Sequence, residues 1–169
     1  MINEIRSGMN VKRFHTTYRA QEETVGHHSA NVAAILLRLA PDCSRNVLVA
    51  ALVHDVPEVY TGDVPAPFKW DHDLIAEGLK EGEQAYAEAN GIPMPELTAE
   101  ERKLLKLADM MDLILSSIED WGRGNQSARQ LVDNGGQYLT GMDLDDDTLI
   151  ACHTMVMETK VLWRLTNHK

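Results

Sequence analysis

The sequence predicts an all-α protein, a single bundle of about six helices. Apolar residues recur at helical spacing along most of the chain, and no stretch shows the alternation of a half-buried strand. The chain has 169 residues, of which 44% are hydrophobic and 25% charged. This size and composition are typical of one globular domain. We therefore expect residues 1–169 to form a single domain.

The first two predicted helices lie close together in the sequence. Apolar spacing predicts one helix over residues 25–39 and a second over residues 47–52, with Asp42 or Ser44 as its cap. The second helix should end near Asp55, because a proline follows two residues later and cannot donate to the helical ladder.

The middle of the chain contains an expected loop and the clearest helix start. Residues 61–69 hold one glycine and two prolines, which favours an ordered loop, and a third helix should follow over about residues 70–90. Thr98 and Glu101 have the spacing of a capping box and predict the start of a fourth helix. Two more helices are expected, a weaker one within residues 126–138 and one over about residues 145–166.

Charge and hydropathy exclude several classes of partner. The formal net charge is −10, so non-specific binding to nucleic acid or to an anionic membrane is not expected. No apolar run approaches the roughly 20 residues of a membrane span. The N-terminus lacks the apolar segment of a secretory signal, and two cysteines make no disulfide framework. These features predict a cytoplasmic protein.

Two histidines and two aspartates form a candidate metal site. His28, His54, Asp55 and Asp109 fall on three predicted helices. A mixed set of imidazoles and carboxylates favours a transition metal over calcium, and such a site leaves positions open for water.

The alternative is that these residues play ordinary structural parts. A His-Asp pair is a weak signal by itself, and the chain has a second one at His72. His54 and Asp55, however, end an apolar helix, where an imidazole and a carboxylate are costly to bury unless paired or bound to metal. Asp109 lies inside an apolar helix, and it or Asp112 could instead pair with a nearby lysine or arginine.

The chain resembles a known family in four stretches that occur in the same order as in the family: residues 13–15, 24–29, 54–69 and 105–109. They are similar to the HD-domain metal-dependent phosphohydrolases. The likeness is greatest to the small helical 5′-deoxynucleotidases and the phage dATP triphosphohydrolases. The resemblance implies an HD-type helical domain, metal-dependent hydrolysis of a deoxynucleotide, and a homo-oligomer, either a dimer or a hexamer. The chain would act in a cell or in a phage-infected host.

The resemblance also assigns the metal ligands. It implies one divalent ion (Co, Mn, Zn, Fe, Ni or Mg) bound by His28, His54, Asp55 and Asp109. The family usually has glutamate immediately before the first ligand histidine, whereas this chain has His27. That difference leaves His27 as an alternative ligand.

The remaining roles carried over from the family concern catalysis and substrate binding. Glu58 and Asp63 would be the catalytic carboxylates, and Arg13, Phe14 and Lys69 would contact the substrate. Taken alone, each has an ordinary explanation. Glu58 could be a surface carboxylate and Asp63 a turn aspartate. Arg13 and Lys69 could be solvated cations, and Phe14 a core residue.

Within the family, we expect conversion of dATP to deoxyadenosine and triphosphate. The alternative is a 5′-deoxynucleotidase acting on deoxynucleoside monophosphates, since both reactions break the bond between the α-phosphorus and O5′. Positive charge for the extra phosphates would distinguish them, and Lys12, Arg19 and Arg123 are the candidates. A second alternative is a non-catalytic helical module that senses a nucleotide or a metal.

Overall fold

The computed structural model describes residues 2–167, and of residues 163–167 the backbone alone. Within this range the chain forms nine helices and no strand, apart from one isolated antiparallel bridge between Lys12 and Thr24. The all-α prediction is confirmed. The helices are α1 (Ile2–Gly8), α2 (Val25–Leu39), α3 (Arg45–Val53), α4 (Glu58–Thr61), α5 (Ala66–Asp71), α6 (Asp73–Ala89), α7 (Ala99–Gly122), α8 (Ala128–Thr140) and α9 (Asp146–Asn167).

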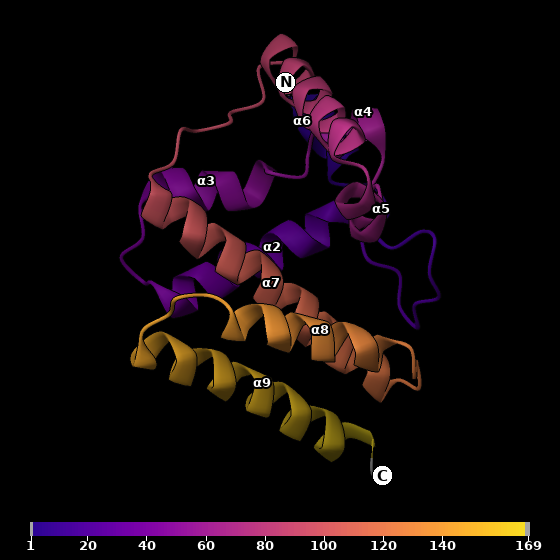
Figure 1. Ribbon diagram of the computed structural model, residues 1–169, viewed down its shortest axis with the longest axis vertical. Coiled ribbons are helices and arrows are strands. Elements are labelled where there is room, and N and C mark those ends of the chain that lie inside the picture. The colour runs from indigo at the N-terminus through magenta and orange to yellow at the C-terminus, as the bar shows by residue number, and fades with distance from the viewer. Residues whose placement is uncertain (1, 168–169) are drawn as a thin grey trace.

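Helix α7 is the centre of the fold (Figure 1). It packs against α2 and α3 and also against α8 and α9. The main core joins α2, α3, α7 and α9 through buried apolar residues: Val32, Ile35, Leu36, Val47, Ala51, Leu107, Ala108, Met111, Ile114, Ile118, Cys152 and Met155.

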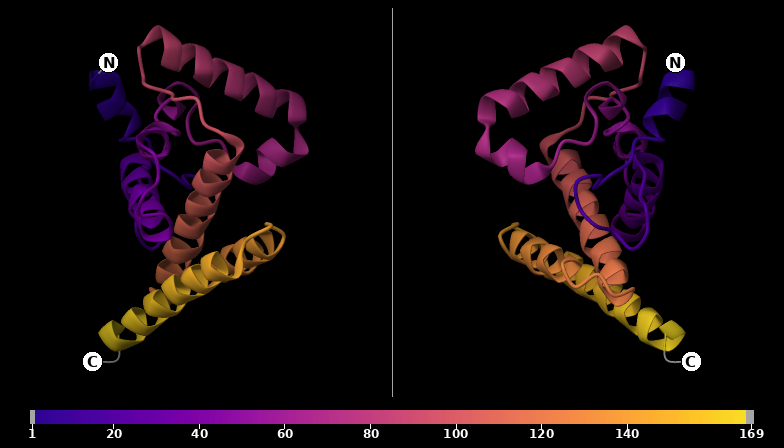
Figure 2. Two further views of the ribbon diagram at one scale, coloured as in Figure 1. Left: turned by 90° about the vertical axis from the view of Figure 1, so that its left-hand side faces the viewer. Right: turned by 90° about the vertical axis from the view of Figure 1, so that its right-hand side faces the viewer.

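A second, smaller core lies at the other end of the molecule. Val53, Val56, Ala87 and Ile92 pack together there, with side chains of α1 against them. Figure 2 shows α5 and α6 as an arm at this end, and α9 as the layer farthest from it. The segment between α3 and α6 therefore joins the two cores, and it carries several of the predicted site residues.

Two caps follow the predicted pattern. The Ser44 hydroxyl accepts from the amide of Val47 at the start of α3. The capping box of α7 is complete, because Thr98 accepts from the amide of Glu101 and Glu101 accepts from the amide of Thr98.

The structure differs from the sequence prediction at the short helices. The expected loop over residues 61–69 becomes helical at Ala66, because Pro67 falls in the first turn, where a fixed φ and a missing N–H are compatible with a helix. The third predicted helix begins only at Asp73, since His72 has a non-helical φ of −141°. Helices α1 and α4 are too short and too polar to give a periodic signal.

No helix in the described part of the chain is long and apolar enough to cross a bilayer.

Candidate metal and phosphate site

His28 is held with one ring nitrogen facing a cluster of polar side chains. It lies in the first turns of α2 and is fully buried. Its Nδ1 atom is 2.7 Å from the Oδ2 atom of Asp112, on α7. A carboxylate accepts hydrogen bonds, so Nδ1 carries the proton and the Nε2 lone pair points the other way. Metal-binding histidines are oriented in this manner by a carboxylate behind the ring.

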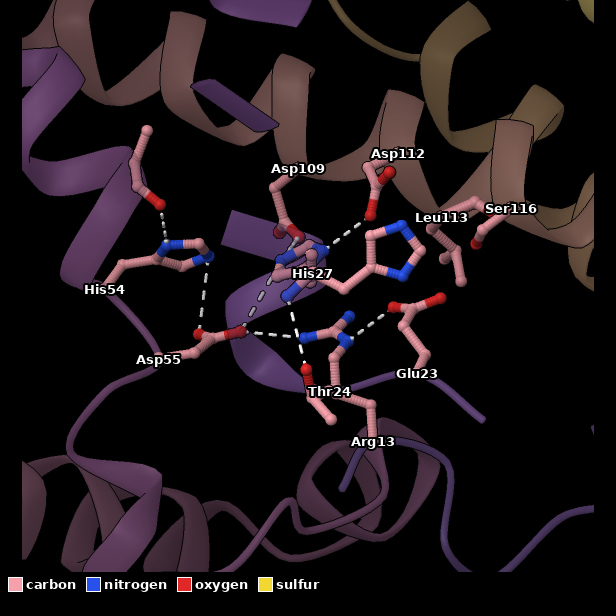
Figure 3. A network of polar contacts seen from close by, with 12 residues as sticks. Arg13, Glu23, Thr24, His27, His54, Asp55, Asp109, Asp112, Leu113 and Ser116 are labelled. Carbon is pink, nitrogen blue, oxygen red and sulfur yellow. Dashed lines mark hydrogen bonds and ion pairs between the residues drawn. The ribbon is translucent and has the colours of Figure 1, made fainter. Parts of the chain in front are cut away.

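His54 meets His28 from a different helix. It follows α3, and its Nδ1 atom donates to the carbonyl of Ala51 at 3.1 Å. The Nε2 atoms of His28 and His54 are both buried and have no hydrogen-bond partner among the described residues. One ligand atom from each of His28, His54 and Asp109 lies within 4.8 Å of the other two. Figure 3 shows His54, Asp55 and Asp109 close to one another.

Asp109 is ionised and has its two oxygens in different environments. Oδ1 lies 3.3 Å from the Nε2 atom of His28, and Oδ2 accepts from the Lys106 ammonium at 2.8 Å. Burial alone would raise the pKa of Asp109, but the neighbouring imidazole of His28 and the charge of Lys106 hold it well below its usual range. The alternative pairing of Asp109 with a lysine is thus correct for one oxygen, while the other faces the histidines.

Asp55 borders this cluster. Its oxygens lie 3.4 Å from Nε2 of His54 and 3.5 Å from Nε2 of His28. Oδ2 also pairs with the Nη1 atom of Arg13 at 2.8 Å. Arg13 in turn uses Nε to donate to Glu23 at 3.0 Å. Its Nη2 amino group is the part of the guanidinium that these two bonds do not use.

Glu58 lies beside these residues as a buried acid. It opens α4, is 8% exposed, and its Oε2 atom has no hydrogen-bond partner. Burial raises the pKa of Glu58 to about 9, with the charges of Asp55 and Asp63 adding to the effect and those of Arg13 and Lys69 opposing it. The structure therefore brings Lys69, which is half-buried in α5, into the same field.

The side chain of Asp63 is bonded to the backbone of Phe14. Asp63 accepts from the amide of Phe14 at 2.7 Å. Phe14 has a positive φ of 54°, which is uncommon for a residue with a side chain. The guanidinium of Arg19 lies 4.5 Å from the centre of its ring.

The cations proposed for extra phosphates lie elsewhere. Lys12 is exposed and pairs with Glu22. Arg19 and Arg123 line a cavity of about 250 Å³ between α2, α7 and α9. Asp112, which bonds Nδ1 of His28, also lines this cavity. The cavity therefore lies on the Nδ1 side of His28, away from the Nε2 atoms. His27 is exposed and lines the same cavity. The histidine that lies close to His54 and Asp109 is therefore His28.

Two buried acids near the site were not predicted from the sequence to belong to it. Asp112 orients His28 from α7, and Glu23 pairs with Arg13. Asp112 shares a helix face with Asp109 only in part. Its bonding partner, His28, is 84 residues away in the sequence. Glu23 lies in a polar stretch where a glutamate is expected to be solvated.

The residues present fit a divalent transition ion. Two imidazole lone pairs, both buried without a hydrogen bond, and an ionised carboxylate face one point. Such nitrogen atoms are costly to leave unpaired, and a metal ion would satisfy both. The mixed nitrogen and oxygen donors match Zn, Mn, Co, Fe or Ni better than calcium.

Comparison with known proteins identifies the family. A family model for 5′-deoxynucleotidase YfbR-like proteins matches residues 2–96, which is more than half of the chain. This chain belongs to the YfbR-like family. The matched region includes α1 to α6 and therefore His28, His54, Asp55 and Glu58, whereas Asp109 lies beyond it.

Curated relatives of the YfbR-like chain are deoxynucleotidases. A 5′-deoxynucleotidase of Pasteurella multocida is 26% identical over 143 residues, which are 69% of this chain and 71% of that protein. The 5′-deoxynucleotidase YfbR of Escherichia coli K12 is 27% identical over 138 residues, 68% of this chain and 69% of that protein. The YfbR-like chain is therefore a hydrolase.

A solved structure shares the fold of this YfbR-like protein. It is the HD phosphohydrolase DatZ of cyanophage S-2L, bound to dA and one catalytic Zn²⁺ ion. The TM-score is 0.68 at 18% identity, and the match covers 97% of this chain and 96% of that one. The resemblance to HD-domain proteins is confirmed by these findings.

Proposed function

We propose that this protein hydrolyses the 5′-phosphoester of a deoxynucleoside, with one divalent metal ion held by His28, His54, Asp55 and Asp109. The pair of buried Nε2 atoms that face Asp109 without hydrogen-bond partners is the observation that carries this proposal. When bound, a divalent ion supplies Lewis-acid stabilisation of phosphoryl charge and makes water at the site more acidic.

The surrounding side chains have chemistry suited to the rest of the reaction. Glu58 is the proposed general acid: its raised pKa keeps a proton on the carboxyl near neutral pH, and that proton would go to the departing 5′-oxygen. Arg13 and Lys69 would hold the phosphate, Arg13 through its Nη2 group. Asp63, which binds the amide of Phe14, would position the substrate loop rather than touch the reacting atoms.

The placement of the cations favours a monophosphate substrate. Lys12, Arg19 and Arg123 are each paired with an acid, and Arg19 and Arg123 line the cavity on the Nδ1 side of His28. A triphosphate carries roughly two to three more negative charges than a monophosphate at neutral pH and needs compensating cations. We therefore place 5′-deoxynucleotidase activity ahead of the dATP triphosphohydrolase activity that the sequence favoured.

The dATP reaction is the second candidate, because the solved structure that shares the fold over nearly the whole chain is bound to dA. In this reaction Lys106, whose ammonium lies beside Asp109, and Lys69 are the cations left to meet the outer phosphates.

A product assay separates these reactions. The purified protein would be incubated with each deoxynucleoside monophosphate and triphosphate, and with the matching ribonucleotides, in Mg, Mn, Co or Zn. Release of inorganic phosphate from monophosphates alone supports the first candidate, and release of intact triphosphate from dATP supports the second. Stoichiometric metal binding with no hydrolysis of any nucleotide would refute both and favour a sensing module.

We also propose that the chain is one domain and self-associates. The shared fold covers 97% of the chain, which supports a single unit. Helix α9 presents an exposed stripe of Leu149, Ile150, Met157 and Val161 on the side away from α7. Sedimentation velocity would show a dimer or hexamer for the wild type and a smaller species for Ile150→Glu. Identical sedimentation of both would refute the stripe as the interface.

A further inference from the structure

Two of the residues expected to contact the substrate lie on an irregular loop that needs support. The loop leaves the bridge at Lys12 and returns to it at Thr24, where the amide of Arg13 donates to the carbonyl of Glu23 at 2.9 Å. It carries Arg13 and Phe14. The positive φ of Phe14 is unfavourable for a residue with a side chain. Such a conformation persists only where neighbouring contacts hold it.

The far end of the loop is fixed to the C-terminal end of α7. Asp120, which is 1% exposed, accepts from the amide of Ala20 at 2.7 Å. Asn125, in the turn after α7, donates to the carbonyl of Tyr18 at 2.9 Å and also bonds Asp120. Figure 1 shows the indigo loop reaching toward the turn between α7 and α8.

A chain of alternating charges runs from this anchor to the metal site. Asp120 lies 3.6 Å from Nε of Arg19, and Nη2 of Arg19 lies 3.5 Å from Glu23. Glu23 bonds Arg13 at 3.0 Å, and Arg13 bonds Asp55 at 2.8 Å. The Arg19 guanidinium also packs on the ring of Phe14 at 4.5 Å. One end of this chain is a proposed metal ligand, and the other is at the end of α7.

Asp120 does not stabilise the helix that carries it. It lies in the last turn of α7, where a negative charge opposes the helix dipole. Burying its carboxylate is also costly unless the bonds it makes are worth more. Its partners are the loop residues Arg19 and Ala20, together with Asn125. The bonds of this carboxylate therefore stabilise the loop and the turn after α7.

We propose that Asp120 and Asn125 are positioning residues for the substrate: they fix residues 18–20 and, through Arg19 and Glu23, set the orientation of Arg13 and Phe14. This inference rests on the proposed function, because it assigns the orientation of the groups that would hold the deoxynucleotide. Neither Asp120 nor Asn125 touches the reacting atoms in this account.

The test compares Asp120→Asn with Glu119→Gln. Both substitutions replace a carboxylate by an amide at the end of α7, but Glu119 is half-exposed and pairs with Arg123 outside the network. Asp120→Asn places an amide donor against the donors of Arg19 and Asn125. We expect its KM for the deoxynucleotide to rise roughly ten- to hundredfold, with kcat within about threefold and one metal ion per chain retained. Glu119→Gln should keep wild-type values.

Hydrogen exchange gives a readout that does not depend on activity. In Asp120→Asn, the amides of residues 12–24 should exchange faster while those of the α7 core stay protected. If Asp120→Asn is insoluble, Arg19→Lys serves as the second variant, because a lysine cannot reach Glu23 and Asp120 together and should raise KM in the same way.

The outcomes separate the two ideas. A wild-type protein that hydrolyses no nucleotide refutes the proposed function, and the exchange of residues 12–24 then still tests the anchor. A hydrolysing wild type whose Asp120→Asn variant has an unchanged KM and unchanged exchange overturns the positioning role. A fall in kcat, metal content and thermal stability together, with KM unchanged, would assign Asp120 a purely structural role and overturn it as well.

Discussion

At the scale of single residues, the site depends on acids that orient other side chains. Asp112 is 3% exposed and bonds the Nδ1 atom of His28, so it decides which ring nitrogen faces the cluster. Glu23 and Asp55 hold Arg13 from two sides. The chemistry of the site is therefore set as much by these contacts as by the ligands themselves.

Asp112→Asn tests this orientation directly. An amide is a weaker acceptor and can present its donor to Nδ1, so we expect metal affinity to fall by about tenfold or more. Affinity would be measured by competition with a chromophoric zinc chelator. Asp133→Asn, an exposed aspartate paired with Arg129, is the control and should bind as the wild type does. Equal affinity in both variants would contradict the role of Asp112.

The raised pKa of Glu58 predicts that the stability of the metal-free protein depends on pH. Its pKa in the folded state, about 9, is above its ordinary value of 4.5, so the folded state binds more protons in this range. The free energy of unfolding should therefore decrease as pH rises from about 5 to 9, by at most about 1.4 kcal/mol per pH unit for this group.

Glu58→Gln isolates that contribution. Burial lowers the pKa of His28, but the carboxylates of Asp109 and Asp112 beside its ring raise it to about 9 overall in the metal-free protein, from 6.5. His28 therefore adds a slope of the same sign only above about pH 6.5. Between pH 5 and 6 the free energy of unfolding of the wild type should fall, and that of Glu58→Gln should fall less. Both would be measured by urea unfolding in the presence of a chelator. Parallel slopes for both proteins would contradict the buried, protonated Glu58.

The sequence could predict the residues with a local signal and not those defined by distant contacts. His54 and Asp55 stand out because they end an apolar helix, and Asp109 because it interrupts one. Asp120 has no such signal, since it follows Glu119 near the end of α7 and resembles a solvated charge. Its partner Ala20 is 100 residues away, so only the fold reveals the bond.

At the scale of elements, the caps divide into those with a side-chain bond and those without. Thr98→Ala removes the hydroxyl that accepts from Glu101 and should lower the free energy of unfolding by about 1 kcal/mol. Ser127, at the start of α8, makes no capping bond, so Ser127→Ala is the matched control and should change stability by less than about 0.5 kcal/mol. Equal losses in chemical denaturation would contradict the capping box.

Two neighbouring glycines of α8 test how closely it packs on α7. A Cβ atom at Gly135 would lie 2.5 Å from Cγ1 of Ile114, whereas one at Gly136 would meet nothing within 4 Å. Gly136→Ala should stabilise the protein by about 1 kcal/mol through helix propensity. Gly135→Ala should be less stable than Gly136→Ala by roughly 1–3 kcal/mol, because Ile114 must move. Equal melting temperatures would contradict this packing.

The elements follow the sequence where periodicity is long and caps are explicit. Helices α2 and α3 begin and end close to their predicted bounds, and α7 begins where its predicted capping box lies. Each has an apolar stripe, and α3 and α7 also have a predicted cap. Helices α1, α4 and α5 have four to seven residues, too few to show a period. Their placement depends on tertiary packing, which a local pattern does not encode.

At the scale of the whole molecule, the proposed metal ion joins three parts of the fold. His28 lies on α2, His54 and Asp55 follow α3, and Asp109 lies on α7, all next to the main core. A ligand that binds only the folded state stabilises it, by about 2.7 kcal/mol at a concentration of 100 times its Kd. Zinc should thus raise the melting temperature of the wild type, and His28→Ala should abolish that increase. An equal increase in both would place the zinc elsewhere.

The most direct measurement is anomalous diffraction at the zinc edge from crystals of the zinc-loaded protein. We expect one anomalous peak per chain, at about 2.0–2.2 Å from the Nε2 atoms of His28 and His54 and beside oxygens of Asp55 and Asp109. A fully loaded crystal with its peak at another site would contradict it.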